Sequence, residues 1–221
     1  MKNKANWLAA ALLLAPFLLI AAFWNKLPAR VPVHWNLRGD VDRWASSKSI
    51  EIFALPLIAV AVVALLRVLP RLDPKLRATL QENERMRAAL QIMCLACAAF
   101  FGALFSIQIA TAFGYTIASG RTVIWCTLAL LAIMGNYLGN LRPNYFVGIR
   151  TPWTLESAAT WRATHRLGGR LMFFGALLLL GAEFFLSQSA FGFLFVTLIL
   201  LLAGWAFLYS WHHFRTHGAT R

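Results

Sequence analysis

This sequence contains very few negatively charged residues. Only 8 of its 221 residues are Asp or Glu, against 21 Lys and Arg, and charged residues of all kinds make up 13%. A soluble domain carries about a quarter charged residues. With 60% hydrophobic residues as well, the composition excludes an ordinary soluble domain and indicates a membrane protein.

Cysteine is also scarce. Cys94, Cys97 and Cys126 all fall inside apolar stretches, and an odd count gives no sign of a structural disulfide framework. The spacing Cys94-x-x-Cys97 is compatible with a thiol pair or half a metal site, but no matching Cys or His cluster lies nearby. We therefore interpret these cysteines as small packing residues.

Recognisable catalytic constellations are missing too. The chain contains no Ser-His-Asp order, zinc-binding helix motif, phosphate loop or pair of carboxylates within a span. We predict a non-enzymatic protein without a metal ion or other cofactor. No soluble basic face suggests direct nucleic-acid binding, so we assign the net charge of +13 to membrane topology and attraction to anionic lipids.

Long apolar runs are what the sequence does contain. Six lie near the roughly 17–25 residues that a membrane-spanning helix requires, and none alternates like a transmembrane barrel strand. We predict an all-α polytopic membrane protein, a bundle of about six transmembrane helices. The runs are about Trp7–Trp24, Ile50–Leu69, Ala89–Ala112, Thr122–Leu141, Leu171–Ser187 and Phe191–Trp211.

Lys and Arg residues are distributed unevenly between the connections. If the N-terminus is cytoplasmic, the inside segments hold 15 of the 21 and the outside segments hold 6. The positive-inside rule then places both termini of this multi-pass protein in the cytoplasm. Lys2, Lys4 and Ile20-Ala21-Ala22 also allow a cleaved signal peptide, but the bulky Phe23-Trp24 favours an uncleaved anchor.

The first external loop, from Asn25 to Ser49, combines a short extended pattern with polar residues. Val31, Val33 and Trp35 alternate with polar or proline positions, which predicts an extended piece, and residues 36–39 predict a turn. His34, Asp40 and Asp42 leave two interpretations open: a divalent metal site or hydrogen-bonded turn residues. We predict the second.

In the connection from Pro70 to Ala88, the sequence predicts a helix that begins at Pro74. Asp73 is a suitable N-cap and Pro74 suits the first helical position. We expect residues 74–88 to form a solvated cytoplasmic extension of the third span.

The third cytoplasmic connection, Leu141–Arg170, is the most polar and most patterned. Pro143 and Pro152 should break helix, and Thr154 is a natural N-cap for a helix that starts at Leu155. Helical spacing then puts two stripes on that helix. The stripes are Trp161, His165 and Gly168, and Arg162, Arg166 and Arg170.

Each stripe has a functional and a structural interpretation. The arginines suit phosphate groups or simply extend to lipid headgroups. His165 titrates near neutral pH or is a packing residue, and we expect Trp161 to anchor at the interface. Gly168-Gly169 allow close helix approach, and Glu183, the one acidic residue within a span, is expected to be structural.

Two strips of sequence lie in these loops: an external strip, residues 31–44, and a cytoplasmic strip, residues 144–154 with 161–166. Together they resemble the SdpI family of bacterial membrane proteins. The external strip resembles the N-terminal domain of unknown function found in that family. The cytoplasmic strip resembles the family signature. We take as functional motif residues Pro32, His34, Trp35, Asn36, Gly39, Asp42, Arg43 and Trp44 outside, and Asn144, Gly148, Arg150, Thr151, Pro152, Trp153, Thr154, Trp161, His165 and Arg166 inside.

The resemblance implies an immunity protein, located in the bacterial cytoplasmic (inner) membrane, that protects the cell against a secreted membrane-active antibacterial peptide. It also implies signalling, by holding a repressor at the cytoplasmic side. Two alternatives are a transporter or lipid-handling protein, and a membrane enzyme that uses His165, Arg150 and Glu156 on a lipid headgroup. We expect one integrated membrane domain, with residues 1–70 as an N-terminal two-helix unit and 71–221 as a four-helix unit.

Overall fold

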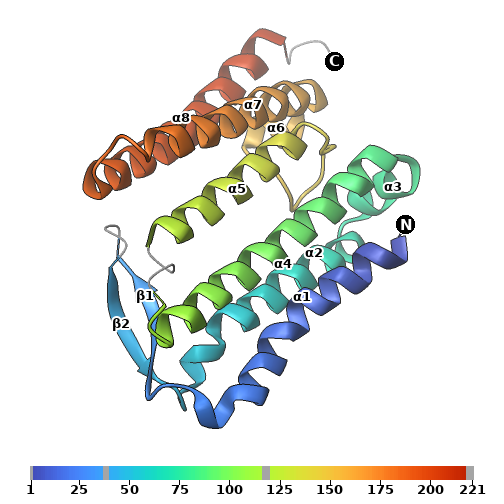
Figure 1. Cartoon of the computed structure of the whole chain (residues 1–221). Coiled ribbons are helices and arrows are strands. Elements are labelled where there is room, and N and C mark those ends of the chain that lie inside the picture. The colour runs from blue at the N-terminus through green and yellow to red at the C-terminus, as the bar shows by residue number, and fades with distance from the viewer. Residues whose placement is uncertain (1, 37–39, 116–119, 218–221) are drawn as a thin grey trace.

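The computed structural model describes residues 2–36, 40–115 and 120–217. Its long helices run up and down, so that both ends of the described chain lie at one end of the bundle (Figure 1). We call this the termini end and the opposite one the hairpin end. The helices are α1 (Lys2–Phe23), α2 (Ala54–Leu72), α3 (Pro74–Glu82), α4 (Glu84–Ala112), α5 (Gly120–Leu138), α6 (Pro152–Glu156), α7 (Ala158–Ala182) and α8 (Gln188–His217), and the strands are β1 (Arg30–Trp35) and β2 (Val41–Ser46).

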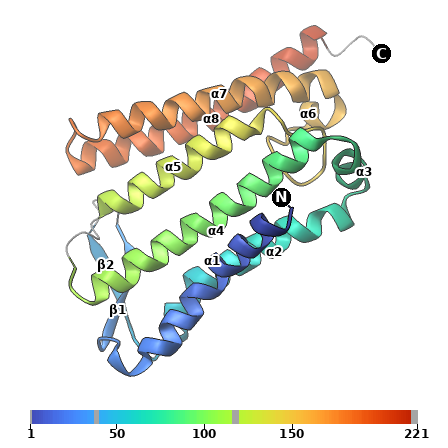
Figure 2. The same cartoon turned by 45° about the vertical axis from the view of Figure 1, so that its right-hand side comes forward.

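Two groups of helices make up the bundle. Helices α1, α2 and α4 pack together, α7 packs against α5 and α8, and α4 joins the groups through its contact with α5 (Figures 1 and 2). The protein is thus an all-α polytopic membrane protein. Helices α1, α2, α4, α5 and α8 are long and apolar enough to cross a membrane.

Helix α7 differs from these five because its first half is charged. The expected fifth span, Leu171–Ser187, covers only the second half of a helix that begins at Ala158. The first half contains three exposed arginines, Arg162, Arg166 and Arg170. These charges explain why α7 is not among the helices that are apolar enough to cross a membrane. Its position beside α5 and α8 nevertheless makes it the sixth long helix of the bundle (Figure 2).

At the hairpin end, the expected extended piece is the first strand of an antiparallel hairpin. Val31 is fully buried with Ile20, Ile52 and Phe105, which fixes β1 against the helices. The amide of Gln108 on α4 also donates to the Pro32 carbonyl at 2.9 Å. The expected turn falls largely on Leu37, Arg38 and Gly39, which lie outside the described residues.

The helix starts at the termini end are partly as predicted. Asp73 caps α3 by accepting a hydrogen bond from the Leu76 backbone N–H, with Pro74 at the start of the helix. The expected continuous extension into the third span is wrong, because Asn83 ends α3 and caps a separate helix, α4. Nor is α3 fully solvated, since Leu76 is buried in the core.

Thr154 does not have the expected capping role. Thr151 is the N-cap of α6, Pro152 begins that helix, and Thr154 completes a capping box with Thr151. Ser157 then caps α7. Pro152 therefore starts a helix here, in accord with its preference for a first helical turn.

Glycines bring α5 and α7 into close contact, as the Gly168-Gly169 pair predicted. A Cβ on Gly135 would lie 2.7 Å from the Gly169 carbonyl oxygen, and one on Gly169 would lie 2.6 Å from the Gly135 carbonyl oxygen. Neither position accommodates a side chain without separating the helices. This contact fixes where α7 presents its stripes of side chains.

Candidate functional site

The motif loop, residues 139–157 between α5 and α7, is held by His165. The Ile149 backbone N–H donates to His165 Nε2 at 2.9 Å, so Nε2 carries no proton. The proton is therefore on Nδ1, which donates to the Trp161 carbonyl at 2.9 Å. Both ring nitrogens are used, and the imidazole stacks on Trp161 with centroids 4.0 Å apart.

Burial keeps this imidazole neutral. His165 is 1% exposed, and desolvation lowers its pKa to about 4 in spite of the favourable hydrogen bond to Trp161. The prediction that His165 is a packing residue is confirmed. A charged ring would need a proton on Nε2, where the Ile149 N–H already points.

Trp161 is not an interfacial anchor, which corrects our expectation. Its side chain is completely buried, and its indole N–H donates to the Leu141 carbonyl at 2.9 Å. The sequence placed it near the membrane surface but did not show that the motif loop folds over it.

Gly148 is required by the same contact. It has a φ of +119°, and a Cβ built there would collide with the His165 imidazole. Glycine alone combines this backbone conformation with the space that the ring needs.

Asn144 organises the first half of the motif loop. Its amide donates to the carbonyls of Arg142 and Val147, both at 2.9 Å. Its carbonyl oxygen accepts from the backbone N–H groups of Phe146 and Val147. The side chain thus replaces the backbone pairing that a non-helical segment lacks.

The second half of the loop is tied to α8. Thr151 hydrogen-bonds to Ser210 through their hydroxyl groups at 2.9 Å, and both residues are buried. Thr154 donates to the Ile149 carbonyl at 2.8 Å, and Trp153 packs edge-on against Phe207. These contacts make the loop a connector between α7 and α8.

Asp73 is a member of this site that the sequence analysis did not include. One carboxylate oxygen caps α3, and the other accepts from the Tyr145 backbone N–H at 2.8 Å. The carboxylate is fully buried, while Arg150 donates to the Tyr145 carbonyl at 2.8 Å. Its role as a helix cap was predictable, but its long-range partner was not.

The predicted cytoplasmic residues therefore fall into two sets. Asn144, Gly148, Thr151, Thr154, Trp161 and His165 hold the loop through buried contacts or close packing, whereas Arg150, Pro152 and Arg166 are exposed and Trp153 is half-buried. The structure brings together a rigid scaffold rather than a row of reactive groups.

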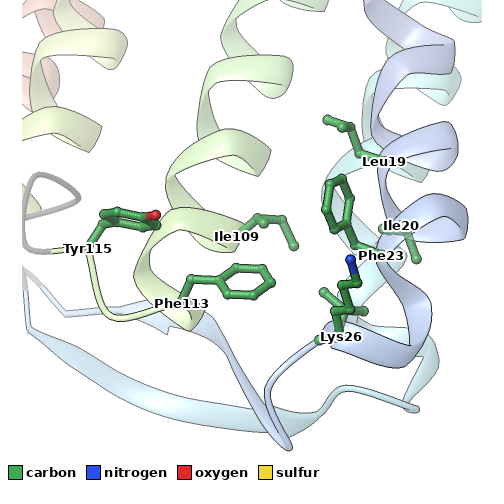
Figure 3. Close-up of a pocket in the computed structure, with 8 residues that line it drawn as sticks. Leu19, Ile20, Phe23, Lys26, Ile109, Phe113 and Tyr115 are labelled. Atoms are coloured by element: carbon green, nitrogen blue, oxygen red, sulfur yellow. The ribbon is translucent and has the colours of Figure 1, made fainter.

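A second candidate site is an apolar cavity of about 320 Å³ at the hairpin end. It lies between the last turns of α1 and α4 (Figure 3). Leu19, Ile20, Phe23 and Lys26 line one side, and Ile109, Phe113 and Tyr115 line the other. The Lys26 ammonium is the charged group among these residues.

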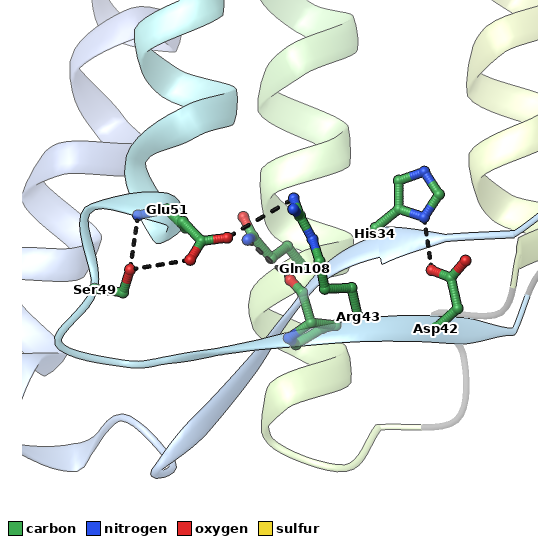
Figure 4. Close-up of polar contacts among 7 residues, drawn as sticks. His34, Asp42, Arg43, Ser49, Glu51 and Gln108 are labelled. Atoms are coloured by element: carbon green, nitrogen blue, oxygen red, sulfur yellow. Dashed lines mark hydrogen bonds and ion pairs between the residues drawn. The ribbon is translucent and has the colours of Figure 1, made fainter.

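Polar contacts fix the neighbouring hairpin (Figure 4). His34 Nδ1 lies 2.6 Å from Asp42 Oδ1 across the two strands, and an Arg43 guanidinium nitrogen lies 3.8 Å from Glu51 Oε2. Backbone and side chain link Asn36 to Asp40. Within the described residues, no group of three or more His, Cys, Asp or Glu is assembled that would hold a metal ion.

The remaining external motif residues pack or face outward. Pro32 is buried, Trp35 and Asn36 are half-buried, and Trp44 is 45% exposed. Gly39 lies outside the described residues. Nearby in the bundle, Glu183 is buried as a structural residue: Arg121 Nε lies 3.1 Å from one carboxylate oxygen, and Trp125 donates to the other at 3.1 Å.

These features define the class, a polytopic helical membrane protein with a two-stranded hairpin at one end of its bundle and the motif loop at the other. Residues 140–210 match the SdpI/YfhL protein family, and residues 11–60 match the Domain of unknown function (DUF1648). The resemblance to the SdpI family, with that N-terminal domain, is confirmed.

One curated relative matches from end to end. The chain is 21% identical to the Immunity protein SdpI of Bacillus subtilis (strain 168) over 221 residues, which is 99% of this chain and 100% of the relative. No solved structure matches the chain.

Proposed function

We propose that this chain is a membrane immunity protein that protects its cell against a secreted membrane-active antibacterial peptide. The supporting comparison is the end-to-end similarity to an immunity protein. The observation that carries the proposal is the apolar cavity between α1 and α4 beside the hairpin. It gives a peptide that enters the membrane a place to be intercepted.

The cavity has the chemistry that such a peptide would meet. Its walls are aliphatic and aromatic, and Lys26 at its rim offers a cation to a carboxylate or a peptide carbonyl. Membrane-active peptides are amphipathic, with an apolar face that a groove of this kind accommodates. In the orientation that we propose, the cavity and the hairpin face the outside of the cell.

Enzymatic activity at the motif loop is not what we propose. A general base must have a free nitrogen or oxygen within reach of its substrate, and both His165 nitrogens are occupied. Arg150 is held by the Tyr145 carbonyl. Two of the three residues considered for a headgroup-modifying enzyme, His165 and Arg150, therefore have structural partners.

Transport is not supported by the loop either. A transporter site is built from broken helices near the middle of the bilayer. Here the non-helical backbone lies at the termini end of the bundle (Figure 1), where Asn144, Asp73 and His165 satisfy its polar groups.

Survival of sensitive bacteria that express the protein tests the immunity proposal. We expect Leu19→Trp, which fills the cavity, to lower protection against the peptide that wild type resists. Leu18→Trp is the matched control because Leu18 is the adjacent residue, is 67% exposed and does not line the cavity. Equal protection by both variants would remove the cavity from the mechanism.

The signalling part of the proposal concerns the motif loop. Tyr145 and Phe146 are 48% and 41% exposed, and aromatic residues are favoured at protein interfaces. We propose that they contact a cytoplasmic repressor. Phe146→Ser should keep protection but abolish the transcriptional response to the peptide; an unchanged response would exclude this contact.

A further inference from the structure

We propose that a groove between α5 and α7 binds the headgroup of an anionic phospholipid, with Arg166 and Arg170 holding its phosphate. The groove has a volume of about 300 Å³ and opens at the face where these two arginines lie beside Asn136, Phe173 and Phe174. This site is separate from the cavity that carries the immunity proposal, and neither depends on the other.

Glycines create the groove. A Cβ on Gly139 would lie 3.6 Å from the Arg166 Cα, so α7 passes directly over a position without a side chain. Gly135 and Gly169 have no room for side chains at all. Arg166 and Arg170 therefore start at or next to this helix contact, and both exposed side chains line the groove.

The positive charge of the groove is not neutralised by the described part of the protein. Arg121 has Glu183 and Arg43 has Glu51, whereas neither Arg166 nor Arg170 forms an ion pair there. Like charges four residues apart on a helix repel each other. An anion between them would relieve that repulsion. A guanidinium group can also donate two parallel hydrogen bonds to two oxygens of one phosphate.

The groove continues into apolar surface, which favours a lipid over a soluble phosphate. Beyond Arg170 the exposed face of α7 continues with Phe174, 64% exposed, and Leu178, 72% exposed. A phosphate at the arginines therefore places acyl chains along aromatic and aliphatic side chains. Basic pockets between membrane helices bind anionic headgroups in this way.

Arg162 shows that a basic residue alone does not make the site. It is exposed on the same stripe of α7, one turn before Arg166, but it does not line the groove. Generic attraction to headgroups would involve all three arginines equally. A bound lipid would depend on Arg166 and Arg170 only.

The test is titration of the purified full-length protein in neutral detergent with phosphatidylglycerol and, separately, phosphatidylcholine, with native mass spectrometry counting the bound lipids. We expect wild type to retain phosphatidylglycerol preferentially. Arg166→Gln together with Arg170→Gln should weaken retention on the order of tenfold. Arg162→Gln together with Arg142→Gln removes the same charge outside the groove and should leave retention unchanged.

Four results would overturn the proposal: no preference of wild type for the anionic lipid, unchanged retention in the Arg166→Gln, Arg170→Gln variant, an equal loss in the control variant, or displacement of the lipid by millimolar inorganic phosphate. The last result would indicate a soluble anion. If the double variant does not fold, the single variant Arg170→Gln is measured, and unchanged retention there contradicts the site. Because the readout is lipid retention rather than survival, failure of the immunity proposal does not affect it.

Discussion

At the scale of single residues, the imidazole of His165 connects protonation to the structure of the motif loop. Its pKa is lowered by burial to about 4, against about 6.5 for an unfolded chain. Above pH 6.5 both states are neutral, so the imidazole contributes no pH dependence. Between pH 6.5 and 4 only the unfolded chain takes up the proton, which removes up to about 3 kcal/mol of stability.

Thermal unfolding in detergent as a function of pH measures this directly. We expect the Tm of wild type to fall more steeply between pH 6.5 and 4 than that of His165→Gln, which cannot titrate. Identical pH profiles for the two proteins would show that the buried imidazole is not the source.

Gly148 gives a second prediction at this scale. Gly148→Ala should destabilise the protein by roughly 2–3 kcal/mol, because φ is +119° and the added methyl group meets the His165 ring. Gly181→Ala on α7 is the matched control, since nothing lies within 4 Å of its Cβ position. The Tm in detergent distinguishes them, and equal Tm values would contradict the His165–Gly148 contact.

The sequence predicts which residues of the motif loop are structurally important, but it does not predict the partners that they contact. The stripe of Trp161, His165 and Gly168 follows from helical spacing, and all three are buried. The bonds from Ile149 to His165 and from Leu141 to Trp161 span 16 and 20 residues. They depend on how the loop folds back, which no local pattern determines.

At the scale of elements, Asp73 joins the α2–α3 corner to the motif loop. The Asp73 carboxylate accepts hydrogen bonds from the Leu76 and Tyr145 N–H groups. Asp73→Asn keeps an oxygen for one of these bonds and places an NH₂ group, which cannot accept, at the other. We expect about 1–3 kcal/mol of destabilisation and faster hydrogen exchange at the Tyr145 amide.

Asn83→Asp supplies the control for this prediction. Asn83 caps α4 through the Met86 N–H alone, so aspartate can replace it. Slow exchange at Tyr145 in Asp73→Asn, as in the control, would show that the long-range hydrogen bond does not hold the loop.

Apolar periodicity located the long helices well and their boundaries poorly. The sequence does not predict the break at Asn83, because a capping residue inside a helical pattern can equally well remain within one continuous helix. Here the burial of Leu76 and Met86 in the core favours a bend between two helices. The start of α7 was assigned to Thr154 rather than Ser157. Both residues are good caps, but the Thr154 hydroxyl is already used in the capping box of α6, and the Ser157 side chain caps α7.

At the scale of the whole molecule, both ends of the described chain lie at the same end of the helix bundle (Figure 1). We predict that the termini end is cytoplasmic, from the excess of Lys and Arg there. Division into units 1–70 and 71–221 also stays a prediction, since α4 packs against α1 and α2 as well as α5.

Labelling with a membrane-impermeant thiol reagent tests the orientation. Trp44→Cys in the hairpin should react in intact spheroplasts, and Tyr145→Cys in the motif loop only after permeabilisation. Wild type serves as the control, because Cys94 and Cys97 are buried and Cys126 is half-buried. The reverse pattern would place the hairpin and its cavity in the cytoplasm.

We propose that this protein keeps a membrane-active peptide from damaging the membrane. The most direct measurement is the membrane potential of sensitive cells, followed with a voltage-sensitive dye during exposure to a panel of pore-forming and depolarising peptides. We predict that cells containing the inserted wild-type protein keep their potential against at least one peptide that depolarises control cells. Depolarisation by every peptide, with wild type correctly inserted, would contradict the account.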